Sequence, residues 1–288
     1  MQLGFIGLGH LGKAIAGRLV SCDHKLIVHN RTAGKAGGLN ATEVDSPKGV
    51  IEKADIVFLC LFDSAAVQAT LEGEAGLLSC DLTGKIIVDL TTNHFRDVIG
   101  FHEVVRNAGG EYLESPVLGS VVPAQNGALT IVTSGDAAAY AKVKGILAQM
   151  GQNLFFLPEP GQATRMKLVN NLALGSIMAT IADSLAMAEK AGIAKEDVLD
   201  ILSVGGGSSL VLNAKKEKLK NEDYATHFSN ALIYKDLHCL QDLAYELKHP
   251  LLTASVVKEL FGKTFEAGFA EEDFCSVYKL LKEPVTKP

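Results

Sequence analysis

The sequence has few cysteines, and their spacing forms no recognisable motif. Its 288 residues include five of them, scattered along the chain at Cys22, Cys60, Cys80, Cys239 and Cys275. Their number is odd and no two form a CxxC pair, which favours reduced thiols over a disulfide framework or a zinc site. There is also no HExxH motif and no G-x-S-x-G elbow. We therefore expect no metal site and no Ser-His-Asp hydrolase.

The sequence also lacks a basic cluster, a secretory signal and an uninterrupted long apolar run. Lys and Arg total 27 against 33 Asp and Glu, giving a net charge of −6, so we expect no nucleic-acid partner. The longest apolar stretch, residues 172–188, is broken by Ser176, Thr180, Asp183 and Ser184. It predicts a buried helix and no membrane association. The default expectation for location is the cytoplasm.

The first half of the chain alternates short apolar runs with helical patterns. Strands are predicted at residues 2–6, 25–29, 54–61, 85–90 and 127–133, and helices at 11–19, 67–71, 95–107 and 137–149. Continuous apolar strands that alternate with helices are typical of a parallel sheet covered on both faces. The sequence thus predicts an α/β fold whose first domain, residues 1–163, is a Rossmann-type, doubly wound, mainly parallel sheet.

The second half shows helical periodicity and no convincing strand. Helices are predicted at residues 165–191, 195–204, 210–221, 229–247, 250–267 and 271–281. The first is long and apolar nearly all round, so we expect it to be buried, partly against another subunit. Gly192 is placed to terminate it as a C′ residue. We therefore predict an all-helical substrate and oligomerisation domain, residues 164–288, joined to the first domain by this long helix.

A glycine motif follows the first strand directly and opens a helix. It consists of Gly7, Leu8, Gly9, His10, Leu11 and Gly12. In a dinucleotide-binding turn, the first glycine allows the turn, the second admits the pyrophosphate and the third lets helix and strand pack closely. The helix N-terminus then offers N–H groups and positive potential to the phosphates. The alternative is a tight turn that holds no ligand.

The end of the second predicted strand indicates which dinucleotide binds. An acidic residue there would accept a hydrogen bond from a ribose 2′-hydroxyl and favour NAD. This sequence has Asn30, Arg31 and Thr32 instead. A guanidinium can hold a 2′-phosphate that a carboxylate would repel, so NADPH is the predicted cofactor. The alternative is a solvated Arg31 in a loop.

Two polar residues lie four apart near the start of the long apolar helix. Lys167 and Asn171 share one helix face, and Asn170 can also reach that side. At the domain junction, we expect these groups to face an interdomain cleft. An ammonium there could stabilise the charge that hydride delivery leaves on a carbonyl oxygen, and donate the proton. The alternative is a snorkelling lysine beside an ordinary amide pair.

Taken in order, six short stretches make the chain resemble the β-hydroxyacid dehydrogenase family. They are GFIGLGHLG at 4–12, NRT at 30–32, DLTT at 89–92, ESPVLGS at 114–120, GQATRMKLVNN at 161–171 and KDL at 235–237. The family includes 3-hydroxyisobutyrate dehydrogenases and glyoxylate/succinic semialdehyde reductases. The resemblance implies a Rossmann domain joined by a long helix to a helical domain. It also implies reversible, nicotinamide-dependent interconversion of a hydroxyacid and its aldehyde acid.

The resemblance implies a role for each matching position. Lys167 would act as the general acid/base and Asn171 would orient the substrate. Leu61 and Thr92 would lie against the nicotinamide, while Lys235 would close over the cofactor cleft. The substrate carboxylate would rest on a loop formed by Ser115, Pro116, Val117, Leu118, Gly119 and Ser120.

The chain departs from the family pattern in that loop. Leu118 stands where the family commonly has serine, which removes a hydroxyl donor, although Ser120 and backbone N–H groups remain. We expect an NADPH-dependent reductase of small aldehyde acids, acting as a homodimer or homotetramer. The alternatives are a 3-hydroxyisobutyrate-type dehydrogenase working oxidatively, an imine reductase relative, and a non-catalytic dinucleotide-binding scaffold.

Overall fold

The computed structural model describes residues 2–282, and the chain divides into two compact units, residues 1–167 and 168–288. The predicted domain boundary at 163/164 lies slightly before this division, inside the helix that runs through both units. Residue 1 and residues 283–288, at the outer ends of the predicted domains, lie outside the described residues. The extent of each functional domain stays a prediction.

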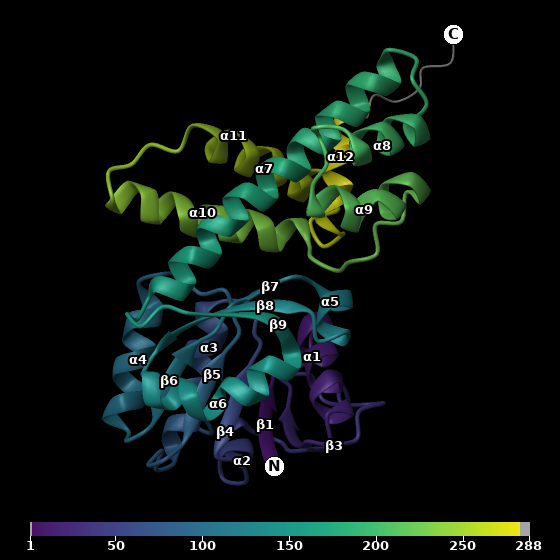
Figure 1. Cartoon of the computed structure of the whole chain (residues 1–288). Helices are drawn as coiled ribbons and strands as arrows, with labels where there is room; N and C mark the ends of the chain where they lie inside the picture. The colour runs from purple at the N-terminus through teal and green to yellow at the C-terminus, as the bar shows by residue number, and fades with distance from the viewer. Residues whose placement is uncertain (1, 283–288) are drawn as a thin grey trace. The chain divides into compact units, whose positions relative to one another are not determined.

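The first unit contains a nine-stranded sheet within the described residues, in the order β3-β2-β1-β4-β5-β6-β8-β7, with β9 paired to β8 (Figure 1). Its strands are β1 (Gln2–Ile6), β2 (Lys25–His29), β3 (Ala41–Glu43), β4 (Ile56–Leu59), β5 (Ile86–Asp89), β6 (Glu111–Glu114), β7 (Val117–Leu118), β8 (Leu129–Gly135) and β9 (Gly151–Phe156). The predicted α/β fold with a Rossmann-type sheet is confirmed.

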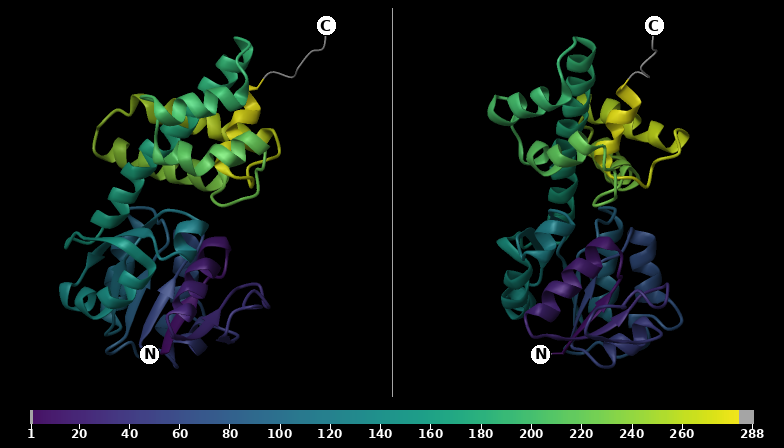
Figure 2. Two further views of the ribbon diagram at one scale, coloured as in Figure 1. Left: turned by 45° about the vertical axis from the view of Figure 1, so that its right-hand side comes forward. Right: turned by 90° about the vertical axis from the view of Figure 1, so that its right-hand side faces the viewer.

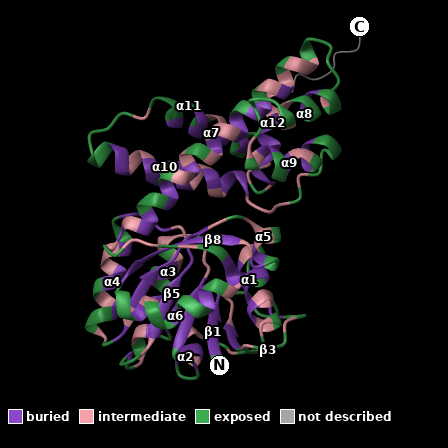
Figure 3. Ribbon diagram, viewed as in Figure 1, coloured by how far each residue is buried: buried purple, intermediate pink, exposed green. Residues whose placement is uncertain are grey.

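Helices cover both faces of this sheet because successive strand residues point to opposite sides. On one face, Leu3 and Phe5 pack with the helices α1 (His10–Ser21), α5 (Val121–Gln125) and α6 (Ala137–Met150). On the other, Ile6 and Val57 pack with α2 (Pro47–Ile51), α3 (Ser64–Glu72), α4 (Asp97–Asn107) and the short helix η1 (Leu77–Ser79). The inner strands are accordingly buried while the outer helix surfaces are exposed (Figure 3).

Part of the sheet differs from the prediction. β8 runs antiparallel to both β6 and β7, so the sheet is mixed rather than mainly parallel along that edge. The strands β3, β6, β7 and β9 were not predicted. They are short, or half exposed as in β9, so they lack the continuous apolar signal of the inner strands.

The strand order reverses between β1 and β4, which defines the ligand-binding edge of such a sheet. The chain leaves β1 to form β2 and β3 on one side, then returns through α2 to β4 on the other side. In doubly wound folds, ligands bind outside the carboxyl ends of the strands at this point. The loops after β1, β2, β4 and β5 carry the predicted cofactor residues of the first unit to that edge.

The second unit is helical in its described part (Figure 2). It contains most of α7 (Gln162–Lys190), then α8 (Lys195–Val204), α9 (Leu210–Asn221), α10 (Asn230–Glu246), α11 (Leu252–Glu266), η2 (Phe274–Val277) and α12 (Tyr278–Leu281). Gly192 has a φ of +81°, as expected of a C′ glycine. The single helix predicted at 271–281 is wrong: it begins later and is split into a 3₁₀ turn and one short helix.

Helix α7 is less buried than its composition suggests. Met166, Val169 and Met187 are exposed on its surface. Its length and mean hydropathy would suffice to cross a membrane, with 39% of its most apolar window buried inside the chain. Core helices of soluble proteins meet the same criterion. The expectation that another subunit covers part of this helix stays a prediction.

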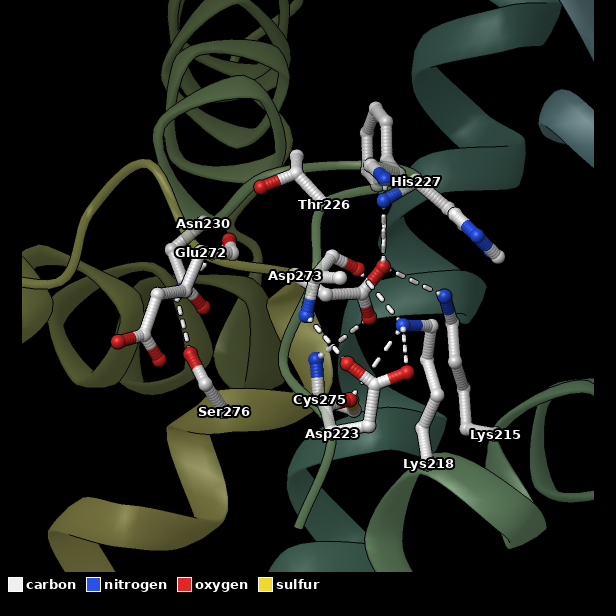
Figure 4. Close-up of polar contacts among 12 residues, drawn as sticks. Lys215, Lys218, Asp223, Thr226, His227, Asn230, Glu272, Asp273, Cys275 and Ser276 are labelled. Atoms are coloured by element: carbon white, nitrogen blue, oxygen red, sulfur yellow. Dashed lines mark hydrogen bonds and ion pairs between the residues drawn. The ribbon is translucent and has the colours of Figure 1, made fainter. Parts of the chain in front are cut away.

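A buried ion pair between α9 and the turn before η2 organises one end of the helical unit (Figure 4). The Nζ of Lys215 lies 2.8 Å from Oδ2 of Asp273, and both side chains are buried. The same carboxylate accepts hydrogen bonds from the backbone N–H groups of His227 and Cys275. Burial alone would raise the pKa of Asp273, but the charge of Lys215 and these hydrogen bonds lower it below its usual value.

We expect Asp273→Asn to destabilise the helical unit by about 3–5 kcal/mol, because it leaves the Lys215 ammonium buried without its counter-charge. Since the pKa of Asp273 is lower folded than unfolded, the ion pair's contribution is complete above about pH 4. It is lost as the pH falls through the lower, folded-state pKa. Urea unfolding of both proteins between pH 7 and pH 3 checks this. Equal stabilities at pH 7 would show that the pair contributes nothing.

Candidate active site

The glycine turn after β1 has the geometry expected of a dinucleotide-binding loop. Gly7 has a φ of +100°, and its N–H donates to the carbonyl of His29 at 3.0 Å. A Cβ on Gly12 would lie 2.0 Å from the carbonyl oxygen of Gly7, so only glycine permits this helix–strand approach. A Cβ on Gly9, in contrast, would meet nothing within 4 Å. Gly9 therefore borders open space of the kind that a pyrophosphate would fill.

The remaining residues of the glycine motif differ in exposure. Leu8 is buried, Leu11 is half-buried and His10 is exposed at the start of α1. Gly9 is the N-cap residue of α1, and no side chain caps that end of the helix. The first turn of α1 thus leaves N–H groups for a ligand, as the phosphate-binding prediction requires.

Asn30 braces the turn from the end of β2. Its Oδ1 accepts a hydrogen bond from the backbone N–H of Leu8 at 2.8 Å, and its Nδ2 donates to the carbonyl of Thr32 at 2.9 Å. Arg31 and Thr32 are exposed beside it. The structure therefore gives Asn30 a structural role that the sequence did not reveal. It leaves Arg31 accessible to a 2′-phosphate.

A pocket of about 630 Å³ adjoins the glycine turn. It lies between α1, the loop before β3 and α5, and the backbone of Gly9 forms part of its wall. Four of its lining side chains are basic and none is acidic: His10, Lys13, Arg18 and Lys35. Such a surface attracts anions, so the residues present fit a phosphate-rich dinucleotide.

Leu61 and Thr92, two further predicted cofactor residues, lie beside a buried hydrogen-bond network at the ends of β4 and β5. The backbone N–H of Leu61 donates to Oγ1 of Thr91 at 3.0 Å, and the N–H of Thr91 donates to Asp89 at 2.9 Å. Thr92, the next residue, is half-buried on the same loop. Asp89 is fully buried, and this burial raises its pKa despite the hydrogen bonds that it accepts.

Asp89 is the centre of this network, a role that was not predicted from the sequence. Its Oδ2 accepts hydrogen bonds from Nδ2 of Asn93 at 2.7 Å and from the hydroxyl of Tyr112. Burial, and then the charge of Asp89, raise the pKa of Cys60 to about 12, so this thiol is not a nucleophile at neutral pH. An acidic residue at the end of an otherwise apolar strand was the available signal.

Lys167 lies beside the predicted substrate loop within the first unit. Its Nζ donates a hydrogen bond to the carbonyl of Val117 at 3.0 Å, and the residue is 7% exposed. α7 supplies the lysine, while the short strand β7, which forms part of the predicted substrate loop, supplies the carbonyl. The structure thus brings together two groups that are 50 residues apart in the sequence.

The substrate loop is buried at its start and accessible at its end. Ser115 is fully buried and donates its hydroxyl hydrogen to Oγ1 of Thr133, while Pro116 and Val117 are buried too. Leu118 and Ser120 are half-buried and Gly119 is exposed. Ser120 is the N-cap residue of α5, but its side chain makes no capping bond. The loop's accessible polar groups therefore come from residues 118–120.

Asn171 belongs to a chain of polar contacts in the second unit. Its Nδ2 donates to Oδ2 of Asp236 at 2.6 Å, and its Oδ1 accepts from Nδ2 of Asn170 at 3.1 Å. The Nζ of Lys235 lies 2.7 Å from the other oxygen of Asp236. Asp236 is buried, and it joins two residues that were predicted separately. In the sequence, the available signal for Asp236 was its position directly after Lys235 in the stretch KDL. Its contact with Asn171 depends on the packing of α10 on α7, which that stretch does not specify.

Two protein-family models together match most of the described chain. Residues 2–157 match the NAD binding domain of 6-phosphogluconate dehydrogenase. Residues 161–281 match the family described as NAD-binding of NADP-dependent 3-hydroxyisobutyrate dehydrogenase. The chain belongs to the β-hydroxyacid dehydrogenase family of NAD(P)-dependent oxidoreductases. The resemblance found in the sequence is confirmed.

The chain is similar to relatives with different names. It is 30% identical to glyoxylate/succinic semialdehyde reductase 1 of Arabidopsis thaliana over 98% of this chain and 99% of that protein. It is 32% identical to the cytokine-like nuclear factor N-PAC of Mus musculus over 96% of this chain, which spans about half the length of N-PAC. The solved structure of Psf3 with NADP+ and 2-OPP matches 97% of this chain and 99% of that one, with a TM-score of 0.90 at 28% identity.

The fold and the family are therefore established, whereas the roles of individual residues stay predictions. Within residues 2–282, no group of three His, Cys, Asp or Glu side chains is placed to hold a metal ion.

We expect Gly9→Ala and Gly12→Ala to fail in different ways. Gly9→Ala should fold normally but lose most of its cofactor affinity, because the new methyl group enters the space that the pyrophosphate needs. Gly12→Ala should lose stability, because its Cβ would collide with the carbonyl of Gly7. Thermal unfolding and dinucleotide titration of both variants check this. Normal cofactor binding by Gly9→Ala would show that no dinucleotide lies against the turn.

Proposed function

We propose that the chain is an NADPH-dependent reductase of small aldehyde acids, of the glyoxylate or succinic semialdehyde type. The observation that carries this proposal is the position of Lys167. Its buried ammonium lies against the backbone of the predicted substrate loop, in the same compact unit as the glycine turn. A dinucleotide-binding scaffold without chemistry would have no need of an ammonium at this position.

The preference for NADPH is supported by the charges around the glycine turn. The end of β2 offers the exposed guanidinium of Arg31 and no carboxylate. The adjoining pocket has basic lining residues and no acidic one. The 3-hydroxyisobutyrate dehydrogenase family that residues 161–281 match is described as NADP-dependent. Psf3, the structural relative, was solved with NADP+.

The chemistry of the proposed reaction is a hydride transfer coupled to a proton transfer. When bound, the reduced nicotinamide supplies the hydride to the carbonyl carbon of the aldehyde acid. Lys167 holds a proton on Nζ and donates it to the carbonyl oxygen, which becomes the hydroxyl of the product. Its ammonium also stabilises the negative charge that develops on that oxygen. Solvent then returns a proton to the neutral amine.

The carbonyl of Val117 positions this proton donor. An ammonium carries three hydrogens, and its hydrogen bond to Val117 uses one of them. Donation to a backbone carbonyl restrains the direction of the side chain. A backbone acceptor also adds no negative charge that would compete with the substrate oxygen.

The Nδ2 group of Asn171 carries two hydrogens, and its hydrogen bond to Asp236 uses one of them. Asp236 accepts a hydrogen bond from Nδ2 of Asn171, and Asn170 donates one to Oδ1 of Asn171. These two contacts fix the plane of the Asn171 amide. An amide held in this way can donate its second hydrogen to a substrate oxygen without titrating. Asn171 lies four residues after Lys167 on one continuous helix, so both side chains leave α7 on the same face.

The substrate class is supported by the similarity over almost the full length of both chains to a glyoxylate/succinic semialdehyde reductase. Leu118 removes the usual hydroxyl donor for the carboxylate. We assign that role to Ser120 and to the accessible backbone of residues 118–120. The 3-hydroxyisobutyrate-type reaction is the same chemistry run toward oxidation, with Lys167 accepting the proton.

We expect Lys167→Ala to lower the turnover number at least ~10²-fold, because the variant lacks the proton donor. The affinity for NADPH should stay unchanged, since the glycine turn and Arg31 are untouched. Steady-state kinetics and fluorescence titration of NADPH check this, with Lys142→Ala on the exposed side of α6 as a matched control. A variant with near-normal turnover would remove Lys167 from the mechanism.

We expect Arg31→Ala to weaken NADPH binding far more than NADH binding. The guanidinium would contact the 2′-phosphate, which NADH does not carry. The dissociation constants of both cofactors measure this difference. Equal losses for NADPH and NADH would refute the assignment of Arg31 to the 2′-phosphate.

A further inference from the structure

The first turn of helix α7 is capped by a carboxylate from a strand that is distant in the sequence. The first backbone N–H groups of a helix have no partner within the helix and are usually capped by a nearby side chain. Here Glu114, the last residue of β6, accepts hydrogen bonds from the backbone N–H of Gly161 and from the N–H and hydroxyl of Thr164. Glu114 is 1% exposed and lies about 50 residues earlier in the sequence.

A second distant side chain completes the cap. Oγ of Ser134, on β8, accepts a hydrogen bond from the backbone N–H of Ala163 at 2.8 Å. Ser134 and Thr164 are buried as well. The first turn of α7 is therefore fixed to the ends of β6 and β8, in addition to the hydrogen bond that the N–H of Gln162 donates to the carbonyl of Glu159 in the preceding loop.

Glu114 stands between the two parts of the proposed reaction site in unit 1. The substrate loop begins at the next residue, Ser115, whose backbone N–H donates to the carbonyl of Asp89 at 2.6 Å. Lys167 comes one helical turn after Thr164 and meets the same loop at Val117. Glu114 thus precedes the substrate loop directly in the chain, and its carboxylate fixes the start of the helix that carries the lysine.

We propose that Glu114 is the positioning residue for Lys167 in the proposed reduction, because its carboxylate holds the first turn of α7 in register with the substrate loop. This inference rests on the proposed function. A carboxylate suits the position because its two oxygens can accept from three donors, and its charge is favourable at a helix N-terminus. A glutamine would present an NH₂ group where N–H donors already point, so it cannot replace the cap.

The main test compares Glu114→Gln with Glu114→Asp. We expect Glu114→Gln to lower the turnover number about tenfold or more, since small displacements of reacting groups are that costly. Its affinity for NADPH should stay within about twofold of the unmodified protein, because the glycine turn is far along the chain. Glu114→Asp keeps the charge and should recover part of the turnover. An unchanged turnover in Glu114→Gln would overturn the proposal.

A double-mutant cycle separates positioning from general loss of structure. If Glu114 acts through Lys167, adding Glu114→Gln to Lys167→Ala should change the residual single-turnover rate by less than about twofold. Independent, multiplicative losses would show that Glu114 acts by another route. Asp136→Asn is the matched control, because Asp136 caps α6 through the N–H of Ala139 at 2.7 Å. It should lose stability but keep its turnover number.

Two further measurements test the cap on α7 independently of the turnover of Glu114→Gln. If Glu114→Gln does not fold, Thr164→Val removes one donor to the carboxylate and should still lower turnover; normal turnover would contradict the proposal. Amide hydrogen exchange at residues 161–167 should accelerate in Glu114→Gln while α6 stays protected. Unchanged exchange there would refute the cap even if no substrate is found. A protein that reduces no aldehyde acid while showing the faster exchange would refute the proposed function alone.

Discussion

A lysine ammonium withdrawn from water is the constraint on which the proposed site depends. Removing such a charge from solvent is costly unless hydrogen bonds replace the lost hydration. Lys167 meets this requirement in part through the carbonyl of Val117, so the lysine and the substrate loop are held against each other. The backbone around them is fixed by buried side chains at the ends of neighbouring strands. Asp89 and Glu114 are in register on β5 and β6, and each accepts several hydrogen bonds from the loops beside it.

These two acidic residues hold the loops and the helix start that form the proposed site. Asp89 fixes the loops that carry Leu61 and Thr92, while Glu114 fixes the start of α7. Buried carboxylates are tolerated there because backbone N–H groups and hydroxyls surround them. In the helical unit, Asp236 orients Asn171 in a similar way. Asn171 and Lys235 thus contact a buried acid directly, whereas the loop of Thr92 and the start of α7 are held by buried acids through backbone N–H groups.

Much of this arrangement was predictable from local patterns. The glycine turn, the inner strands, the long helix and the all-helical second half follow from apolar periodicity and from motifs a few residues long. The family itself was recognisable from six short stretches. The edge strands β3, β7 and β9 were not predicted, because they are short or half-exposed and carry no strong apolar signal. The antiparallel direction of β8 was missed because periodicity does not encode strand direction.

The residues that support the site were the least predictable part. Glu114 and Asp236 appeared in the sequence motifs, but their partners lie about 50 and 65 residues away. Asn30 was predicted as a cofactor contact, and the structure also shows it bracing the backbone of Leu8. Ser115 was predicted to bind substrate, yet its hydroxyl is used inside the core by Thr133. Such roles depend on long-range packing, which short motifs do not specify.

The most direct measurement is a cofactor-oxidation assay of the full chain with a panel of short aldehyde acids, using NADPH and NADH in parallel. The absorbance of the reduced nicotinamide follows hydride transfer in each reaction. We predict rapid oxidation of NADPH with glyoxylate or succinic semialdehyde, slower oxidation of NADH, and at least ~10²-fold slower oxidation of NADPH by Lys167→Ala. Near-normal, substrate-dependent oxidation by Lys167→Ala, or no oxidation with any aldehyde acid, would contradict the proposed role of Lys167.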